Sequence, residues 1–193
     1  MDEIFFIGAF FIIFLIWFGI RAYYGKQARG HTVKERVRPG TESILVGLNF
    51  VGMMILPLLV VFTPFLDRFA IAIPGLVRFA FLAILALNLG LFVLAHRDLG
   101  KNWSAILEIK EGHHLVRNGI YTTIRHPMYA HLWIWVIAQG IVLANGLVLV
   151  FGIAAWGLLY FLRVPREEEM LIAEFGNEYR EYMRKTGRVI LKF

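Results

Sequence analysis

The chain has 193 residues, of which 59% are hydrophobic and only 18% carry a charge. Soluble domains are usually about 45–50% apolar and about 25% charged, so this chain cannot bury its apolar surface in a water-soluble core and is expected to be an integral membrane protein. The absence of cysteine excludes disulfides, cysteine nucleophiles and thiolate metal sites.

The net charge of +6 is distributed in blocks along the chain. Eighteen of the 20 Lys and Arg residues fall in three segments, 21–38, 97–125 and 163–192, which long apolar runs separate. This alternation is typical of the positive-inside rule, in which basic loops stay on the cytoplasmic side beside anionic headgroups. It favours a lipid bilayer, and not nucleic acid, as the partner of the basic segments.

The first predicted span covers about residues 4–21, which is long enough to cross roughly 30 Å of hydrocarbon. Its N-terminal flank is acidic and its C-terminal flank is basic, the reverse of a secretory signal, so we expect a retained helix. A basic connector leads to the second predicted span, about residues 43–62. Pro57 lies inside this span and is expected to kink the helix.

The third predicted span covers about residues 75–95, and Arg78 near its outer end is expected to snorkel to the interface. A polar loop from 100 to 125 follows on the cytoplasmic side. Two shorter apolar runs, about residues 131–144 and 147–162, then predict a helical hairpin, because a turn signal, Asn-Gly, separates them.

The remaining segment, 163–193, is polar. Pro165 fits the first turn of a final helix, with an acidic run, Glu-Glu-Glu, near the positive end of its dipole. Apolar side chains at Leu171, Phe175, Tyr179 and Tyr182 give this helix one apolar face, so it should lie along the membrane surface or over the preceding loop. The predicted fold class is therefore an all-α integral membrane protein, a single domain over 1–193 with five spans, its N-terminus outside and its C-terminus cytoplasmic.

Histidines gather in the polar loop before the hairpin, where His113, His114 and His126 precede His131. His126 and His131 are five residues apart and cannot share one face of a helix, so we predict no metal site. The chain also lacks a Gly-rich phosphate or dinucleotide loop, and neither of its two serines lies in a nucleophile-elbow sequence.

Three segments carry a resemblance: GHHLVRNGIY, RHPMY, and EEEMLIAEFGNEYREY followed by TGR. In this order they resemble the signature of the isoprenylcysteine carboxyl methyltransferase family, and most closely its archaeal integral membrane methyltransferases. The likeness covers the C-terminal half at motif level, from about Asn102. It implies S-adenosylmethionine as the cofactor, with S-adenosylhomocysteine as the product, in a cytoplasmic pocket built from segments 100–130 and 163–193.

The resemblance also implies a role for particular residues. Arg163 matches the arginine that binds the substrate and is the predicted catalytic residue, whereas His114 and Met128 stand where the eukaryotic enzymes have threonine and serine. The implied acceptor is a prenylated or other lipid-like molecule that enters from the bilayer. The implied cofactor-binding residues are His113, Leu115, Val116, Tyr121, His126, Pro127, Met128, Tyr129 and Glu167.

These residue types suit methyl transfer. S-adenosylmethionine carries a sulfonium, an ammonium and a carboxylate, so Glu167 can accept hydrogen bonds from its ammonium or ribose while tyrosine rings face the sulfonium. A carboxylate acceptor, with a pKa of about 4, is ionised at neutral pH and needs no general base, and Arg163 can hold it by a two-pronged hydrogen bond.

Two alternatives stay open at this point. The acceptor could be a phospholipid amine, which must lose a proton before methylation and would need a histidine base. The protein could instead be a small membrane scaffold or transport subunit that binds anionic lipid, although few polar residues lie deep in the predicted spans. The resemblance to prokaryotic members predicts the cell membrane as the location.

Overall fold

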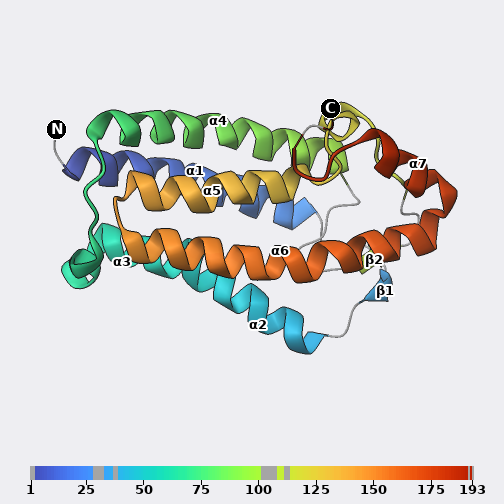
Figure 1. Cartoon of the computed structure of the whole chain (residues 1–193), viewed down its shortest axis with the longest axis horizontal. Coiled ribbons are helices and arrows are strands. Elements are labelled where there is room, and N and C mark those ends of the chain that lie inside the picture. Colours follow the sequence, from blue (N-terminus) through green and yellow to red (C-terminus); the bar gives the residue numbers. More distant parts are fainter. Residues whose placement is uncertain are drawn as a thin grey trace.

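The structure is a computed structural model that describes residues 3–27, 33–36, 39–100, 108–110, 114–190 and 192. Long helices run side by side along one axis, and the two chain ends lie toward opposite ends of this bundle (Figure 1). The bundle helices are α1 (Glu3–Gln27), α2 (Pro39–Phe50), π-helix η1 (Val51–Ile55), α3 (Leu56–Phe62), α4 (Gly75–Leu99), α5 (Pro127–Val142) and α6 (Gly146–Phe175).

Four of these stretches are long and apolar enough to cross a membrane: α1, Glu42–Phe62, α4 and α6. The fifth apolar helix, α5, is shorter at 16 residues. Large apolar side chains such as Leu76, Leu87 and Phe161 are exposed on the outside of the bundle, where hydrocarbon can solvate them. The chain is a multi-pass integral membrane protein.

Pro57 has a specific effect on the second span. The turn directly before it, Val51–Ile55, is a π-helix, and the N–H of Leu56 bonds to the carbonyl of Val51. In this register the bond from residue 57 would reach Gly52, but proline has no N–H. The Gly52 carbonyl accepts from Nε2 of Gln139 instead, at 3.0 Å, so α5 satisfies the group that the proline leaves open.

The snorkelling expected of Arg78 is wrong. Its side chain is only 7% exposed and donates to both carboxylate oxygens of Glu3, at 2.6 and 3.0 Å. Its Nε donates to the carbonyl of Val142 at 2.9 Å, and its guanidinium lies 4.0 Å from the centre of the Phe6 ring. Arg78 turns inward because the first turn of α1 supplies a carboxylate, and it thereby ties α1, α4 and α5 together at the end of the bundle opposite α7 (Figure 1).

The predicted hairpin is present, with α5 and α6 joined at Asn145. The Asn145 side chain caps α6 by accepting from the N–H of Val148 at 3.1 Å, and it donates to the carbonyl of Leu66 on the neighbouring 3-10 helix, η2 (Pro64–Phe69), at 3.0 Å. This capping explains why the chain can reverse direction within so few residues.

The predicted helix start at Pro165 is wrong. Helix α6 runs without a break through Pro165 to Phe175, and the chain turns only at Gly176, whose φ is +56°. A proline inside a helix costs about 3 kcal/mol, but the polar side chains on both sides of it bind partners on other elements, as described below. The predicted final helix is consequently divided into the second half of α6 and a separate α7 (Asn177–Lys185).

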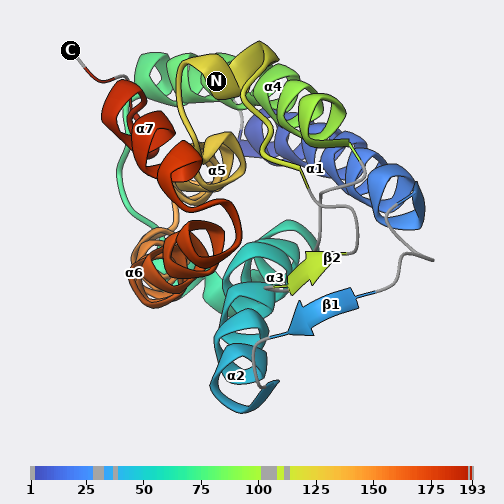
Figure 2. The same cartoon turned by 90° about the vertical axis from the view of Figure 1, so that its right-hand side faces the viewer.

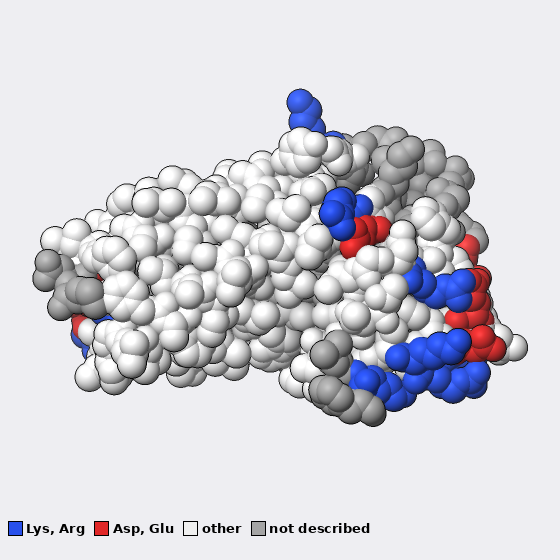
Figure 3. Space-filling model, turned by 90° about the horizontal axis from the view of Figure 1, so that it is seen from above, with Lys and Arg blue, Asp and Glu red and all other residues white. Residues whose placement is uncertain are grey.

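The all-α prediction describes the bundle but misses a short ribbon. Strand β1 (Val33–Arg36) pairs antiparallel with β2 (Glu108–Lys110), so two polar connectors meet at the end of the molecule that carries α7 (Figures 1 and 2). Charged side chains gather at this same end on the face shown in Figure 3, and the long middle section carries almost none. The fold therefore collects the polar segments at one end of an apolar bundle.

Candidate functional site

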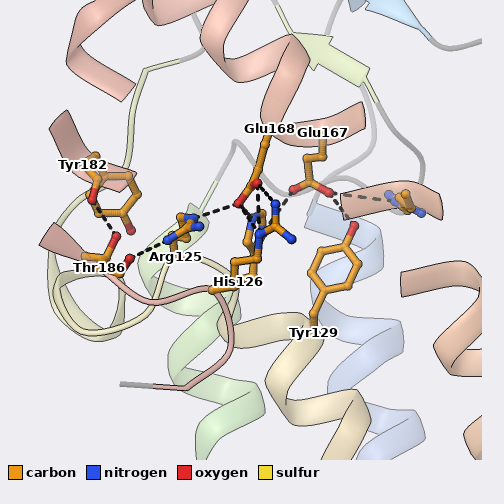
Figure 4. A network of polar contacts seen from close by, with 9 residues as sticks. Arg125, His126, Tyr129, Glu167, Glu168, Tyr182 and Thr186 are labelled. Carbon is orange, nitrogen blue, oxygen red and sulfur yellow. Dashed lines mark hydrogen bonds and ion pairs between the residues drawn. The ribbon is translucent and has the colours of Figure 1, made fainter. Parts of the chain in front are cut away.

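The candidate site lies at the charged end, where the first residues of α5, the second half of α6 and the segment after α7 meet (Figure 4). The loop that leads into it is anchored by Gly119, whose φ is +56° and whose Cβ, if present, would lie 1.9 Å from Oδ2 of Asp98. The same Asp98 oxygen accepts from the N–H of Ile120 at 2.9 Å. The positive φ favours glycine, and a Cβ here would also displace the Asp98 carboxylate.

Tyr121 fixes the next part of the loop, which the short 3-10 helix η4 (Gly119–Thr122) forms. Its carbonyl accepts from the hydroxyl of Tyr182 on α7 at 2.6 Å, and its own hydroxyl donates to Ala95 at 3.4 Å. Burial of the Tyr121 ring, followed by the nearby Glu167 charge, raises the pKa of its hydroxyl well above the ordinary value. Tyr121 therefore stays neutral and connects α4, the loop and α7.

The segment after α7 runs parallel to residues 124–126. The N–H groups of Arg125 and His126 donate to the carbonyls of Gly187 and Arg188, each at 2.9 Å. A Cβ at Gly187 would lie 1.8 Å from the carbonyl oxygen of Ile190, so the turn that brings this segment back requires glycine. The motif Thr-Gly-Arg thus places Arg188 beside the RHP segment.

Glu168 is the centre of the resulting network. Its carboxylate accepts from Nε of Arg125 at 2.8 Å, from Nε2 of His126 at 3.2 Å and from Nε of Arg188 at 3.1 Å (Figure 4). Burial by itself would raise the pKa of Glu168, but the hydrogen bonds from His126, Arg188 and Arg125 outweigh it and lower that pKa to about 2. An ionised carboxylate only accepts, so Nε2 of His126 carries the proton.

Glu167 has a different environment. Its side chain is 25% exposed, compared with 4% for Glu168. The hydroxyl of Tyr129 donates to Oε2 of Glu167, and Nδ1 of His126 lies 3.8 Å from Oε1. Nε of Arg163 is 4.0 Å from Oε2, one helical turn away on α6. Glu167 is thus the carboxylate of the pair that remains accessible to a ligand.

The structure brings four of the residues singled out by the sequence into one cluster: His126, Tyr129, Arg163 and Glu167. The other residues that the resemblance implied for the cofactor differ in burial. Val116, Tyr121 and Pro127 are buried, Leu115 and Met128 are half-buried, and Pro127 occupies the first turn of α5, where its missing N–H has no cost. His113 lies outside the described residues.

Sequence reasoning missed Glu168 as the central acid, along with the contributions of Arg125, Thr186 and Arg188. Arg125 also donates to the carbonyl of Thr186, which joins the loop to the end of α7. Three consecutive glutamates on a helix differ only in the direction in which their side chains point, so the sequence could not show which one faces these partners. The arginines of the RHP and Thr-Gly-Arg motifs were the available signals.

Together, the fold and the cluster define a multi-pass membrane protein with a polar site at one end of its helical bundle. Residues 79–173 match the model of the isoprenylcysteine carboxyl methyltransferase (ICMT) family. The family resemblance found in the sequence is therefore confirmed for this part of the chain.

Curated relatives are named protein-S-isoprenylcysteine O-methyltransferase. The Xenopus laevis protein is 35% identical over 129 residues, which are 62% of this chain and 44% of the relative. The Dictyostelium discoideum protein is 33% identical over 90 residues, 45% of this chain and 38% of the relative. The Saccharomyces cerevisiae protein is 35% identical over 96 residues, 49% of this chain and 40% of the relative. The chain thus spans less than half the length of these relatives.

A solved structure of the eukaryotic intramembrane Ras methyltransferase ICMT resembles this fold. The TM-score is 0.55 at 26% sequence identity, and the match covers 80% of this chain and 53% of the other. The likeness therefore extends well beyond the segment that the family model matches.

Proposed function

We propose that this protein is an integral membrane methyltransferase that uses S-adenosylmethionine to methylate the carboxylate of a prenylated or other lipid-like acceptor. The observation that carries the proposal is the cluster of His126, Tyr129 and Glu167 beside Arg163, where two polar segments far apart in the sequence meet at one end of an apolar bundle. The names of the relatives support the same activity.

The residues of the cluster suit the cofactor. The exposed part of Glu167 can accept hydrogen bonds from an ammonium or a ribose hydroxyl, and the aromatic ring beside it is that of Tyr129, whose hydroxyl donates to Glu167. When bound, S-adenosylmethionine supplies an activated methyl group and leaves as S-adenosylhomocysteine. We assign the cofactor to the residues that the sequence singled out: His113, Leu115, Val116, Tyr121, His126, Pro127, Met128, Tyr129 and Glu167.

Within this set Tyr121 and Val116 hold the loop in place, and Glu167 is the acid that a ligand can reach. Tyr121 and Val116 are almost fully buried, so their contribution is to position the backbone of residues 115–121. Glu168 fixes the ring of His126 through Nε2 and directs Nδ1 toward Glu167. The site is therefore organised before the cofactor arrives, which reduces the cost of ordering it.

Arg163 suits the acceptor carboxylate. It follows the apolar part of α6, residues 147–162, and its side chain is 14% exposed. A guanidinium in a place with little water can hold a carboxylate firmly and orient one oxygen toward the methyl group. Because the acceptor is already ionised, the protein has to align and desolvate it and does not have to remove a proton.

We further propose five spans, with the site at the cytoplasmic leaflet of a prokaryotic cell membrane. At about 1.5 Å per residue, α5 is about 24 Å long, somewhat less than the roughly 30 Å of a hydrocarbon core. Its first residues, which carry His126 and Tyr129, then lie close to the depth at which a lipid headgroup sits. A prenylated acceptor can reach that depth without leaving the bilayer.

Two measurements test this function. Detergent-solubilised, folded protein should bind S-adenosylhomocysteine with a dissociation constant in the micromolar range. The absence of binding at high micromolar concentration would exclude S-adenosylmethionine as the cofactor. Labelled methyl groups should then be transferred to prenylated thioether acids within a panel that also holds fatty acids and phospholipids. The product should be labile to base, as an ester is; a base-stable product would identify a phospholipid amine as the acceptor.

A further inference from the structure

Helices α2 and α6 pack antiparallel along a single row of contacts. Asn49 on α2 donates to the carbonyl of Ala155 on α6 at 3.0 Å. One turn farther out, the position of a Cβ on Gly52 lies 3.5 Å from the Cα of Gly152. At the inner end of the same row, Oε1 of Glu42 lies 3.1 Å from Nη1 of Arg163.

Glu42 therefore binds the guanidinium that we assign to the acceptor. Both side chains are only 14% exposed, so their mutual attraction is screened less than that of a surface pair. Glu42 approaches Arg163 at Nη1, whereas Glu167 lies near Nε at 4.0 Å. An acceptor carboxylate entering this place meets a guanidinium that already has a carboxylate partner.

Helix α2 forms the inner half of the second span, and few of its described side chains are buried. Ile44, Val46 and Leu48 are exposed, and among the side chains described between residues 42 and 50, Leu45 and Asn49 are buried against the bundle and Glu42 is half-buried. The π-helical turn Val51–Ile55, followed by Pro57, separates this half from the outer half of the span. Irregular turns of this kind are the points at which membrane helices bend.

We propose that Glu42 is a displaceable substitute for the acceptor carboxylate. It holds Arg163 when no acceptor is present. When the acceptor carboxylate binds Arg163, Glu42 and helix α2 move away from it. This inference rests on the proposed function. It names Glu42 as a residue that determines specificity for ionised acids, because only a charged acceptor can compete with a carboxylate for the guanidinium.

The same competition favours release of the product. Esterification removes the negative charge of the acceptor, so the ester loses its strongest interaction with Arg163. Glu42 then regains the guanidinium and excludes the ester. The contact between Glu42 and Arg163 therefore acts once on binding and once on release.

The test is Glu42→Gln, which keeps the shape of the side chain and removes its charge. We expect the KM for an N-acetylated S-prenylcysteine to fall about threefold or more, because a weaker competitor remains, and inhibition by the corresponding methyl ester to become stronger. Affinity for S-adenosylhomocysteine should stay within about twofold of wild type, which also reports that the variant is folded. The matched control is Glu169→Gln, which removes one exposed charge from α6 and should change none of these values.

A binding measurement makes the result independent of turnover. The acid form of the same prenylcysteine is titrated into protein loaded with S-adenosylhomocysteine, and Glu42→Gln should bind it more tightly than wild type. If wild type transfers no methyl group, the proposed function fails while this titration still decides the role of Glu42. An unchanged or weaker affinity of Glu42→Gln for the acid, or no binding to either protein, overturns the inference. The inference is also overturned if Glu42→Gln raises the affinity for the acid in a protein that already carries Arg163→Gln.

Discussion

Glu167 and Glu168 follow one another on α6, and the rotation of about 100° per residue directs their carboxylates to different neighbours. Glu168 is surrounded by Arg125, His126 and Arg188, and almost none of its surface is free. Glu167 bonds to Tyr129 and keeps a quarter of its side chain exposed. At the scale of single residues, one acid therefore holds the protein together and the other is available for a ligand.

This division predicts separate effects for two substitutions in the site. Glu167→Gln should weaken the binding of S-adenosylhomocysteine about tenfold or more, because it replaces a carboxylate that the ligand can reach with a neutral amide. Arg163→Gln should raise the KM for the acceptor and leave cofactor affinity within about twofold. Isothermal titration and steady-state kinetics give the two quantities. Equal losses of both affinities in each variant would contradict the assignment.

The lowered pKa of Glu168 predicts that the stability of the folded protein depends on pH. Its pKa in the folded protein, about 2, is below the ordinary value of 4.5, so the folded state favours the ionised form. The stabilisation is therefore complete above about pH 4.5 and is lost as the pH falls from there toward 2. Thermal unfolding in detergent should show wild type losing stability across this range. Glu168→Gln should unfold at a lower temperature at pH 7, and its difference from wild type should shrink below pH 4.5; a constant difference would argue against this role.

At the scale of helices, small residues decide how closely neighbours approach. A Cβ on Gly140 of α5 would lie 2.5 Å from the Cα of Leu149 on α6, and one on Gly152 would lie 3.3 Å from Nε2 of Gln139. This close approach allows Gln139 to reach the open carbonyl of Gly52 in the π-helical turn. The hairpin and the irregular second span therefore depend on each other.

Two glycine substitutions form a matched test of this packing. Gly140→Ala should destabilise the protein by about 1–3 kcal/mol, because the backbone of Leu149 cannot move away without separating α5 from α6. Gly90→Ala lies on the exposed face of α4 with no atom within 4 Å of the new Cβ, and it should be neutral or stabilising by up to about 1 kcal/mol. Thermal unfolding of the two variants in the same detergent makes the comparison. A Gly140→Ala protein as stable as wild type would show that the hairpin tolerates a wider separation.

At the scale of the whole molecule, the two ends of the bundle differ in chemistry. At one end, Arg78 contacts Glu3 and Val142, and Asn145 contacts Leu66. The opposite end carries the ribbon, α7 and the network around Glu168 (Figures 1 and 4). Charged side chains gather at that second end on the face shown in Figure 3, and the basic loops of the sequence are the basis for placing it in the cytoplasm.

The absence of cysteine makes this orientation directly testable. Asp67→Cys at the outer turn and Glu169→Cys beside the site both introduce a thiol at an exposed position. In intact cells, a maleimide that cannot cross the membrane should label Asp67→Cys, and it should label Glu169→Cys only after the membrane is opened. Labelling of both from outside would mean that the bundle does not separate these residues by a bilayer, and the reverse pattern would invert the proposed orientation.

Much of the bundle could be predicted from residue patterns. The apolar runs, the Asn-Gly turn and the location of Pro57 each act through local chemistry, so the helices follow from neighbouring residues. The errors lie where distant residues contribute. Arg78 is buried because Glu3 reaches it, and α6 continues through Pro165 because partners on other elements hold its side chains.

The sequence by itself determined the membrane class, the family resemblance and the segments that meet at the candidate site, because hydrophobic runs and motifs are properties of neighbouring residues. Only the tertiary structure decided which glutamate is buried, which histidine nitrogen faces Glu168, and that Glu42 reaches Arg163. These facts depend on how helices far apart in the chain are rotated against one another, and a spacing along the sequence does not contain that rotation.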